Sequence, residues 1–122
     1  MLSIIIISYN VKFYLRQCIR SIYNSKIDLQ TEIIVVDNDS FDNSSKMIEK
    51  EFPNVILLKN KKNLGFSKAV NQGAEIAKGE FVCLVNPDSI LKNNTLNELK
   101  LGLKRSILKF DFSQSFDIPI GS

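Results

Sequence analysis

Acidic and amide side chains that directly follow apolar runs are the residues best placed to do chemistry. Asp37 follows the mostly apolar run 32–36, and the tripeptide Asn86-Pro87-Asp88 follows the run 81–85. The Asp37 carboxylate can accept hydrogen bonds from a nucleobase N–H or a ribose hydroxyl, and an Asp at such a place is just as often a cap or an Asx-turn residue. Asp88 offers hard oxygen ligands suited to Mg²⁺ or Mn²⁺, and such an ion would neutralise a diphosphate leaving group. As a bare tripeptide, 86–88 is explained equally well as a proline turn.

A third candidate is the segment 62–66, whose sequence is Lys-Asn-Leu-Gly-Phe. Gly65 permits a tight turn, and the helix expected after it would present backbone N–H groups to an anion. Taken alone, the segment is explained as well by an ordinary strand-to-helix loop with solvated lysines. Asp39 and Ser40 lie where another helix is expected to begin, so capping is the stronger interpretation for one of them. Asp37 is therefore the better functional candidate.

The composition limits both the chemistry and the partners. The 122 residues contain no histidine, so acid–base or metal chemistry must rest on carboxylates, amides, hydroxyls and lysines. The formal charge of +3 comes from lysines spread along the chain and not from a basic face interleaved with aromatic residues, so nucleic acid is not an expected partner. With 44% hydrophobic residues, the chain fits one globular domain with a core of its own.

The two cysteines and the apolar start indicate the cellular compartment. Cys18 and Cys83 fall inside apolar patterns, where isolated cysteines are more often buried thiols than a disulfide or a metal pair. The apolar segment 1–7 is too short for a membrane span and lacks the basic flank and cleavage site of a signal peptide. We expect a cytoplasmic protein, with a place at the cytoplasmic face of the membrane as the alternative.

Apolar runs alternate with segments of helical periodicity, and these elements must position the candidate residues. Buried strands are predicted at 2–7, 32–36, 55–58 and 81–85. Helices are predicted over 11–23 with Asn10 as N-cap, through 47–52 with a stop at Pro53, from Phe66 to an end at Gly79, and through 96–107 with Thr95 as cap. The tail 110–122 is polar and aperiodic, and we expect it to fray.

This alternation of strands and helices predicts an α/β fold: a Rossmann-like, mostly parallel sheet with helices on both faces. In such a sheet, ligands bind beyond the carboxyl ends of the strands. That rule brings 8–10, 37–39, 59–66 and 86–88 to one edge, and the combination is more specific than any of its members. A flavodoxin-like or receiver domain is set aside, because the first strand ends in Ser-Tyr-Asn and not in paired acids.

Four ordered segments resemble family 2 glycosyltransferases of the GT-A fold, particularly the rhamnosyltransferase-like branch. They are 3–10 (SIIIISYN), 32–40 (EIIVVDNDS), 63–73 (NLGFSKAVNQG) and 79–88 (GEFVCLVNPD). The resemblance implies that residues 1–90 bind a nucleoside diphosphate sugar, with UDP- or dTDP-sugars as the expected donors. It also implies polysaccharide biosynthesis, with a glycan or a lipid-linked acceptor.

The resemblance assigns roles around the donor. Tyr9 would line the nucleobase pocket, and Asp37 would hydrogen-bond the base. One wall of the donor site would be formed by Lys62, Asn63, Gly65 and Phe66, with Asn71 supporting it. The remaining donor-binding candidates are Ser8, Asn10, Asp39 and Asn86.

The resemblance also implies a metal position. Asp88 would stand in the family's D-x-D motif and hold Mg²⁺ or Mn²⁺. Asn86 occupies the first place of that motif, as is common in the rhamnosyltransferase-like branch. A neutral amide oxygen binds a divalent ion less strongly than a carboxylate, so affinity for the ion without a diphosphate is expected to be weak.

The family's inverting mechanism needs a carboxylate base, which deprotonates an acceptor hydroxyl for attack on the anomeric carbon. That base belongs to an acidic pair in the second half of the domain, and after Glu98 only Asp111 and Asp117 remain, neither in such a setting. We expect 91–122 to be a helix and a divergent tail, with the acceptor half and the base missing. The catalytic residues stay unassigned. The chain is therefore either a glycosyltransferase or a non-catalytic nucleotide-sugar-binding or interaction remnant of one.

A half-domain would leave a sheet edge and apolar helix faces uncovered. Uncovered edges and apolar patches favour pairing with other chains. We therefore expect self-association into a homo-oligomer through the exposed edge.

Overall fold

The computed structural model describes residues 1–25 and 29–90. The predicted helix 96–107 and the predicted tail 110–122 lie outside these residues. In chain order the elements are β1 (Leu2–Ser8), α1 (Lys12–Asn24), β2 (Thr31–Asp37), α2 (Ser44–Glu51), β3 (Ile56–Lys59), α3 (Phe66–Ile76) and β4 (Phe81–Leu84). Every strand and helix predicted within the described residues is thus present, with ends that differ by one to a few residues.

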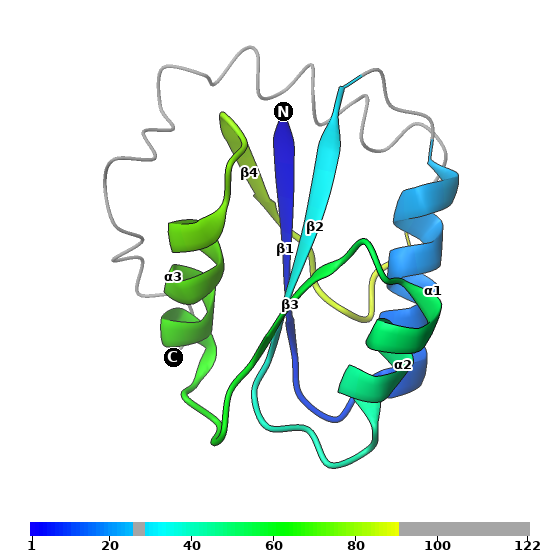
Figure 1. The fold of residues 1–122 in the computed structure, drawn as a ribbon, viewed down its shortest axis with the longest axis vertical. Helices are drawn as coiled ribbons and strands as arrows, with labels where there is room; N and C mark the ends of the chain where they lie inside the picture. Colours follow the sequence, from blue (N-terminus) through cyan, green and yellow to red (C-terminus); the bar gives the residue numbers. More distant parts are fainter. Residues whose placement is uncertain (26–28, 91–122) are drawn as a thin grey trace.

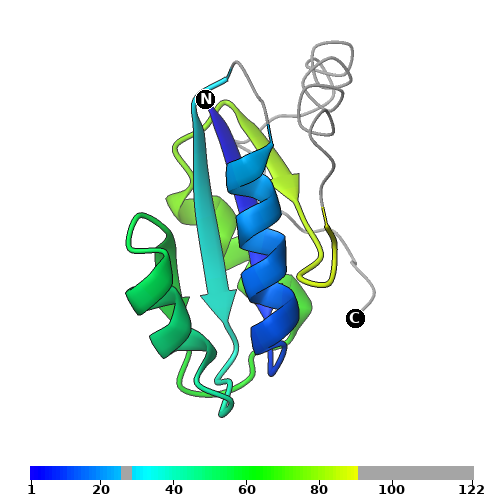
Figure 2. The same ribbon diagram turned by 90° about the vertical axis from the view of Figure 1, so that its right-hand side faces the viewer.

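The strands form one parallel sheet in the order β3-β2-β1-β4 (Figure 1). β1 is paired along its whole length with β2, from Leu2 opposite Thr31 to Ser8 opposite Asp37. Figures 1 and 2 show α1 and α2 on one face and α3 on the other, which confirms the predicted Rossmann-like fold. Because all strands run in the same direction, the loops that follow them meet at one edge, here called the carboxyl edge.

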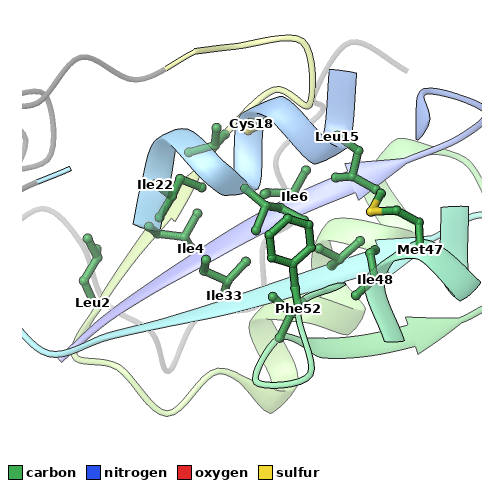
Figure 3. Close-up of a cluster of buried hydrophobic side chains, with 14 residues drawn as sticks. Leu2, Ile4, Ile6, Leu15, Cys18, Ile22, Ile33, Met47, Ile48 and Phe52 are labelled. Atoms are coloured by element: carbon green, nitrogen blue, oxygen red, sulfur yellow. The ribbon is translucent and has the colours of Figure 1, made fainter. Parts of the chain in front are cut away.

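Each face of the sheet has its own core, because residues along a strand point alternately to opposite faces. Leu2, Ile4 and Ile6 of β1 pack beneath α1 and α2, where the larger cluster of buried side chains lies (Figure 3). Ile5 points to the other face and packs in a smaller cluster with Ala69 of α3. The uninterrupted apolar run of β1 is therefore explained by burial on both faces.

The predicted cap of α1 is wrong. Asn10 has a left-handed backbone with φ of 53°, and the helix begins two residues later at Lys12. The side chain that reaches the first turn belongs to Asp42 in the β2–α2 loop, whose Oδ2 accepts a 3.0 Å hydrogen bond from the Lys12 N–H. Sequence periodicity could not show this, because the partner comes from another loop.

The predicted cap of α2 by Asp39 or Ser40 is wrong as well, because α2 begins at Ser44. Oδ1 of Asp42 accepts hydrogen bonds from the Ser44 N–H, at 3.0 Å, and from the Ser44 hydroxyl. Burial raises the pKa of Asp42, but the hydrogen bonds from Ser44 and Lys12 outweigh it and hold the pKa below its usual value. One carboxylate therefore serves the first turns of both helices.

Gly79 does not end α3, contrary to the prediction, because the helix ends at Ile76. It lies before β4, where a Cβ would come within 2.6 Å of the Ser3 Oγ and 2.7 Å of the Met1 carbonyl oxygen. The Gly79 N–H donates to the Ser3 Oγ at 2.9 Å, and that hydroxyl donates to Glu32 Oε2 at 2.5 Å. Glycine is needed here because the chain passes close to β1 at the amino edge of the sheet.

Both cysteines carry free thiols, as predicted, with Cys18 fully buried and Cys83 half-buried. No helix in the described part of the chain is long and apolar enough to cross a membrane.

Candidate functional site

A cleft of about 650 Å³ opens at the carboxyl edge, with an apolar floor that includes Ile5, Ile7 and Leu84. This volume is typical of a small-molecule site. The predicted donor-binding residues that line the cleft are Tyr9, Asn63, Gly65, Phe66 and Asn86. The predicted site residues outside its lining are Ser8, Asn10, Asp37, Asp39, Lys62, Asn71 and Asp88. The structure thus brings together part of the predicted set.

The ring of Tyr9 is held at the cleft by contacts between the β1–α1 and β2–α2 loops. It packs edge-to-face against Phe41, with ring centroids 6.3 Å apart. The Asn10 N–H donates to the Ser40 Oγ at 2.9 Å, and the Phe41 N–H donates to Asn10 Oδ1 at 2.9 Å. Asn10 therefore joins the two loops outside the cleft lining, while Tyr9, 46% exposed, lines the cleft.

Asp37 is 2% exposed, and its side chain stabilises the turn after β2, which is the structural role that the sequence left open beside a functional one. Its carboxylate accepts hydrogen bonds from the Ser40 N–H at 3.0 Å, the Ser40 hydroxyl at 2.5 Å and the Ser45 hydroxyl at 3.4 Å. Strand alternation points Asp37 toward the α1 and α2 face, where Ile33 and Val35 of β2 also pack. Its contact with a base therefore stays a prediction.

Asn38 lines the cleft, although the sequence reasoning placed it at this edge only as part of 37–39 and did not name it as a donor-binding candidate. It is 3% exposed, and its Nδ2 donates to the Gly65 carbonyl oxygen at 3.2 Å. Val36, two residues earlier, packs on the α3 face. Counting the strand alternation one residue past Asp37 would have shown that Asn38 follows Val36 to the face with the cleft.

The loop before α3 forms the opposite wall. Gly65 precedes the helix with φ of 86°, which confirms the predicted need for glycine in this turn. The Gly65 N–H donates to Asn63 Oδ1 at 2.8 Å, and its carbonyl oxygen accepts the Ala69 N–H at 3.3 Å. Phe66, the first residue of α3, is 41% exposed at the cleft. The wall therefore offers an amide, backbone and an aromatic ring.

The segment after β4 carries the candidate metal residues. The backbone carbonyl of Asn86 accepts the Ser89 N–H at 2.9 Å and lies 3.8 Å from the Cys18 thiol. Burial, and to a smaller extent the negative charge of Asp88, raise the pKa of Cys18 to about 11. Asp88 is exposed, and its charge acts on Cys18 of α1.

The described residues fit a divalent ion only as part of its coordination shell. They contain no group of three or more acidic or cysteine side chains able to hold a metal, so an ion at Asp88 would need waters or ligand oxygens to complete its coordination. Mg²⁺ commonly binds through one or two carboxylates, waters and substrate phosphates. Asp88 with the Asn86 amide therefore suits an ion that arrives with a diphosphate.

The other predicted site residues, Asp39, Lys62, Ser8 and Asn71, do not line the cleft. The side chains of Asp39 and Lys62 are exposed, and Asp39 has φ of 66°. The Ser8 Oγ and the Asn71 Oδ1 are buried without a hydrogen-bond partner among the described residues. The roles predicted for these residues at the donor stay predictions.

The curated relatives of the chain include glycosyltransferases and a teichoic acid biosynthesis protein. The minor teichoic acid biosynthesis protein GgaB of Bacillus subtilis is 33% identical over 101 residues, which are 80% of this chain and 11% of GgaB. Glycosyltransferase GlyG of Streptococcus pneumoniae is 31% identical over 102 residues, which are 81% of this chain and 34% of GlyG. The chain thus spans about a third or less of the length of these relatives.

Solved structures and a family model agree with the fold. TarS 1-349 of S. aureus in complex with UDP-GlcNAc matches with a TM-score of 0.74 and 26% identity, over 85% of this chain and 31% of TarS. The mannosyltransferase PcManGT of Pyrobaculum calidifontis, in complex with GDP-Man and Mn²⁺, matches with a TM-score of 0.75 over 84% of this chain and 32% of PcManGT; at 22% identity it shows the fold alone. The family model described as glycosyl transferase family 2 matches residues 3–105. The chain therefore belongs to glycosyltransferase family 2, and its described residues have the Rossmann-like fold of GT-A enzymes.

Proposed function

We propose that the cleft binds the nucleoside diphosphate of a UDP- or dTDP-sugar, and that residues 1–90 are the donor-binding region of a glycosyltransferase. The observation that carries this proposal is the cleft at the carboxyl edge, where an exposed Tyr9 ring stands near the Asn38 and Asn63 amides over an apolar floor. An aromatic face can stack on a base, and amides can hydrogen-bond its edge. The UDP-GlcNAc complex of TarS supports this choice of donor.

We propose that Asp88 and Asn86 hold Mg²⁺ or Mn²⁺ together with the diphosphate. When bound, the ion supplies positive charge next to the leaving diphosphate. Asp88 anchors this arrangement with its exposed carboxylate, and Asn86 lines the cleft beside it. The Mn²⁺ in the PcManGT structure supports a divalent ion in this fold.

Transfer is proposed to proceed with inversion, onto a glycan or lipid-linked acceptor in polysaccharide biosynthesis. This needs a base for the acceptor hydroxyl. None of the described residues that line the cleft carries a carboxylate, so the base is expected from outside this lining. The same observation favours a second candidate, a nucleotide-sugar-binding or interaction module without turnover.

Two further proposals concern the surroundings of the protein. A cytoplasmic place, or one at the cytoplasmic face of the membrane, suits the free thiols of Cys18 and Cys83.

Self-association is proposed through the outer edge of β4, which pairs with no described strand on that side. Size-exclusion chromatography with light scattering tests it, and a monomer at all concentrations would contradict it.

Thermal unfolding with nucleotides tests donor binding. UDP or dTDP at millimolar concentration should raise the Tm, and Mn²⁺ should increase the shift, since a ligand at 100 times its Kd stabilises by about 2.7 kcal/mol. Asp88→Ala should remove the contribution of Mn²⁺ but not that of the nucleotide. Glu75→Ala, at an exposed acid of α3 outside the cleft lining, is the matched control and should retain both. The absence of any nucleotide-dependent shift would sink the proposal.

Turnover separates the two candidates. The wild-type chain and Asp88→Ala are incubated with UDP-GlcNAc and Mn²⁺, and released UDP is measured. Release that depends on Asp88 supports an enzyme, and binding without release supports the binding module.

A further inference from the structure

The amide of Asn38, which lines the cleft, is hydrogen-bonded to the first of two further amide side chains outside the lining. Asn60, directly after β3, donates through its Nδ2 to Asn38 Oδ1 at 2.9 Å and to Gln72 Oε1 at 2.8 Å. Gln72 of α3 donates back through its Nε2 to Asn60 Oδ1 at 2.9 Å. Asn60 and Gln72 thus form a reciprocal amide pair, and the Asn60 Nδ2 also donates to Asn38. Neither of the two lines the cleft.

The amide pair fixes which way the Asn38 amide points. Asn38 Oδ1 receives the Asn60 Nδ2, and the Leu64 N–H points at the same oxygen from 3.4 Å. An amide offers an acceptor on one side and donors on the other, so these two donors leave the Asn38 Nδ2 to face the Gly65 carbonyl at 3.2 Å. Reversing Asn38 would set donor against donor and acceptor against acceptor.

Asn38 in turn fixes the wall of the cleft. Its contacts with Leu64 and Gly65 hold both sides of the turn that leads into α3. The Asn60 N–H donates to the Asp37 carbonyl at 2.9 Å, so Asn60 itself is anchored to the end of β2. The loop is therefore tied to β2, β3 and α3 at one place.

We propose that Asn60 and Gln72 are positioning residues of the donor site: they act through Asn38 to hold the Asn63–Gly65 wall in its binding geometry. This inference rests on the proposed function, because it assumes that the cleft binds a nucleotide. A wall that is held before binding loses less conformational freedom when the ligand arrives, so the amide pair contributes to affinity without touching the ligand.

The experiment compares two ends of the same sheet, with UDP and Mn²⁺ as ligands of the full chain. Gln72→Met keeps the length of the side chain but removes both bonds to Asn60. Asn60→Asp keeps the size but removes the donor to Asn38. Ser3→Ala is the matched control, because Ser3 is buried and joins Glu32 to Gly79 in a similar network at the amino edge.

We expect Gln72→Met and Asn60→Asp to weaken UDP binding about three- to tenfold, the effect of losing about one net hydrogen bond. Ser3→Ala should lower the Tm about as much as the two cleft-side variants do, but it should leave the Kd for UDP unchanged. Amide hydrogen exchange of Leu64 should accelerate in the two cleft-side variants, without ligand, and should not change in Ser3→Ala.

An unchanged Kd and unchanged Leu64 exchange in both cleft-side variants would overturn the proposal. An equal loss of affinity in Ser3→Ala would also overturn it, because the effect would then be one of general stability. If the wild-type chain bound no UDP, the proposed donor binding would be wrong, while the exchange rate of Leu64 would still support or contradict the hold on the loop.

Discussion

The two faces of the sheet carry the same kind of side chain but use it differently. Ile6 points toward α1 and α2 and is fully buried in the larger core, whereas its neighbour Ile7 points to the α3 face and is half-buried in the cleft floor. The helices α1 and α2 cover the first face, and α3 covers the second (Figures 1 and 2). The apolar run of β1 therefore builds a closed core on one face and the floor of a binding site on the other.

The largest expected difference between the faces is in the loss of stability caused by Ile6→Ala and by Ile7→Ala. Truncating a fully buried Ile should lower the free energy of unfolding by about 2–5 kcal/mol, because a cavity remains in a packed core. Ile7→Ala should cost about 1 kcal/mol, since its side chain is partly exposed already. Urea unfolding measures both, and equal losses would contradict the comparison.

Gly73→Ala tests how closely α3 approaches the sheet. A Cβ at Gly73 would lie 2.8 Å from Ile5 Cγ2, and that branch is fixed within a fully buried side chain. The expected loss of stability is about 1–3 kcal/mol, which outweighs the usual helix preference of Ala over Gly. Glu75→Ala, at an exposed position of the same helix, should change stability by less than about 0.5 kcal/mol. A stabilised Gly73→Ala variant would show that α3 can move outward without cost.

Cys18 gives the α1 face a dependence on pH. Its pKa of about 11 in the folded chain lies above the usual 9.0, so between these values the unfolded chain loses the thiol proton and the folded chain keeps it. Stability from Cys18 is therefore complete below pH 9 and is lost as the pH rises toward 11, by about 1 kcal/mol at pH 10. Urea unfolding from pH 7 to 10 should show this slope in the wild-type chain and a shallower one in Cys18→Ala. Identical slopes would exclude the effect.

The ion pairs that join α1 to α2 should matter least. Glu51 lies 2.9 Å from Arg16 and 3.1 Å from Arg20, and all three side chains are partly exposed. Glu51→Gln should cost less than about 1 kcal/mol, and the cost should shrink in 1 M salt. A loss as large as that of Ile6→Ala would mean that charge, and not apolar packing, closes this face.

The fold was predictable because it depends on periodicity within segments, and the site was predictable only in part. Strand runs such as that of β1 and the glycine at position 65 carry their structural meaning locally. The roles of Asp42 and Asn38 do not, because each is set by a partner in another loop: the Lys12 N–H for Asp42 and the Gly65 carbonyl for Asn38. Both its position after an apolar run and the resemblance directed attention to Asp37, whereas the alternation of side chains along the strand shows that its neighbour Asn38 reaches the cleft.

The turn at Gly65 also shows that handedness, and not room, limits this wall. A Cβ added there would meet nothing within 4 Å, yet φ of 86° and ψ of 171° belong to a region that L-residues other than glycine rarely enter. The mirror image of these angles lies in the ordinary β region. A D-alanine placed at position 65 by chemical synthesis would therefore favour the backbone angles of the native turn, and it would stiffen the wall in a way that none of the genetically encoded L side chains can.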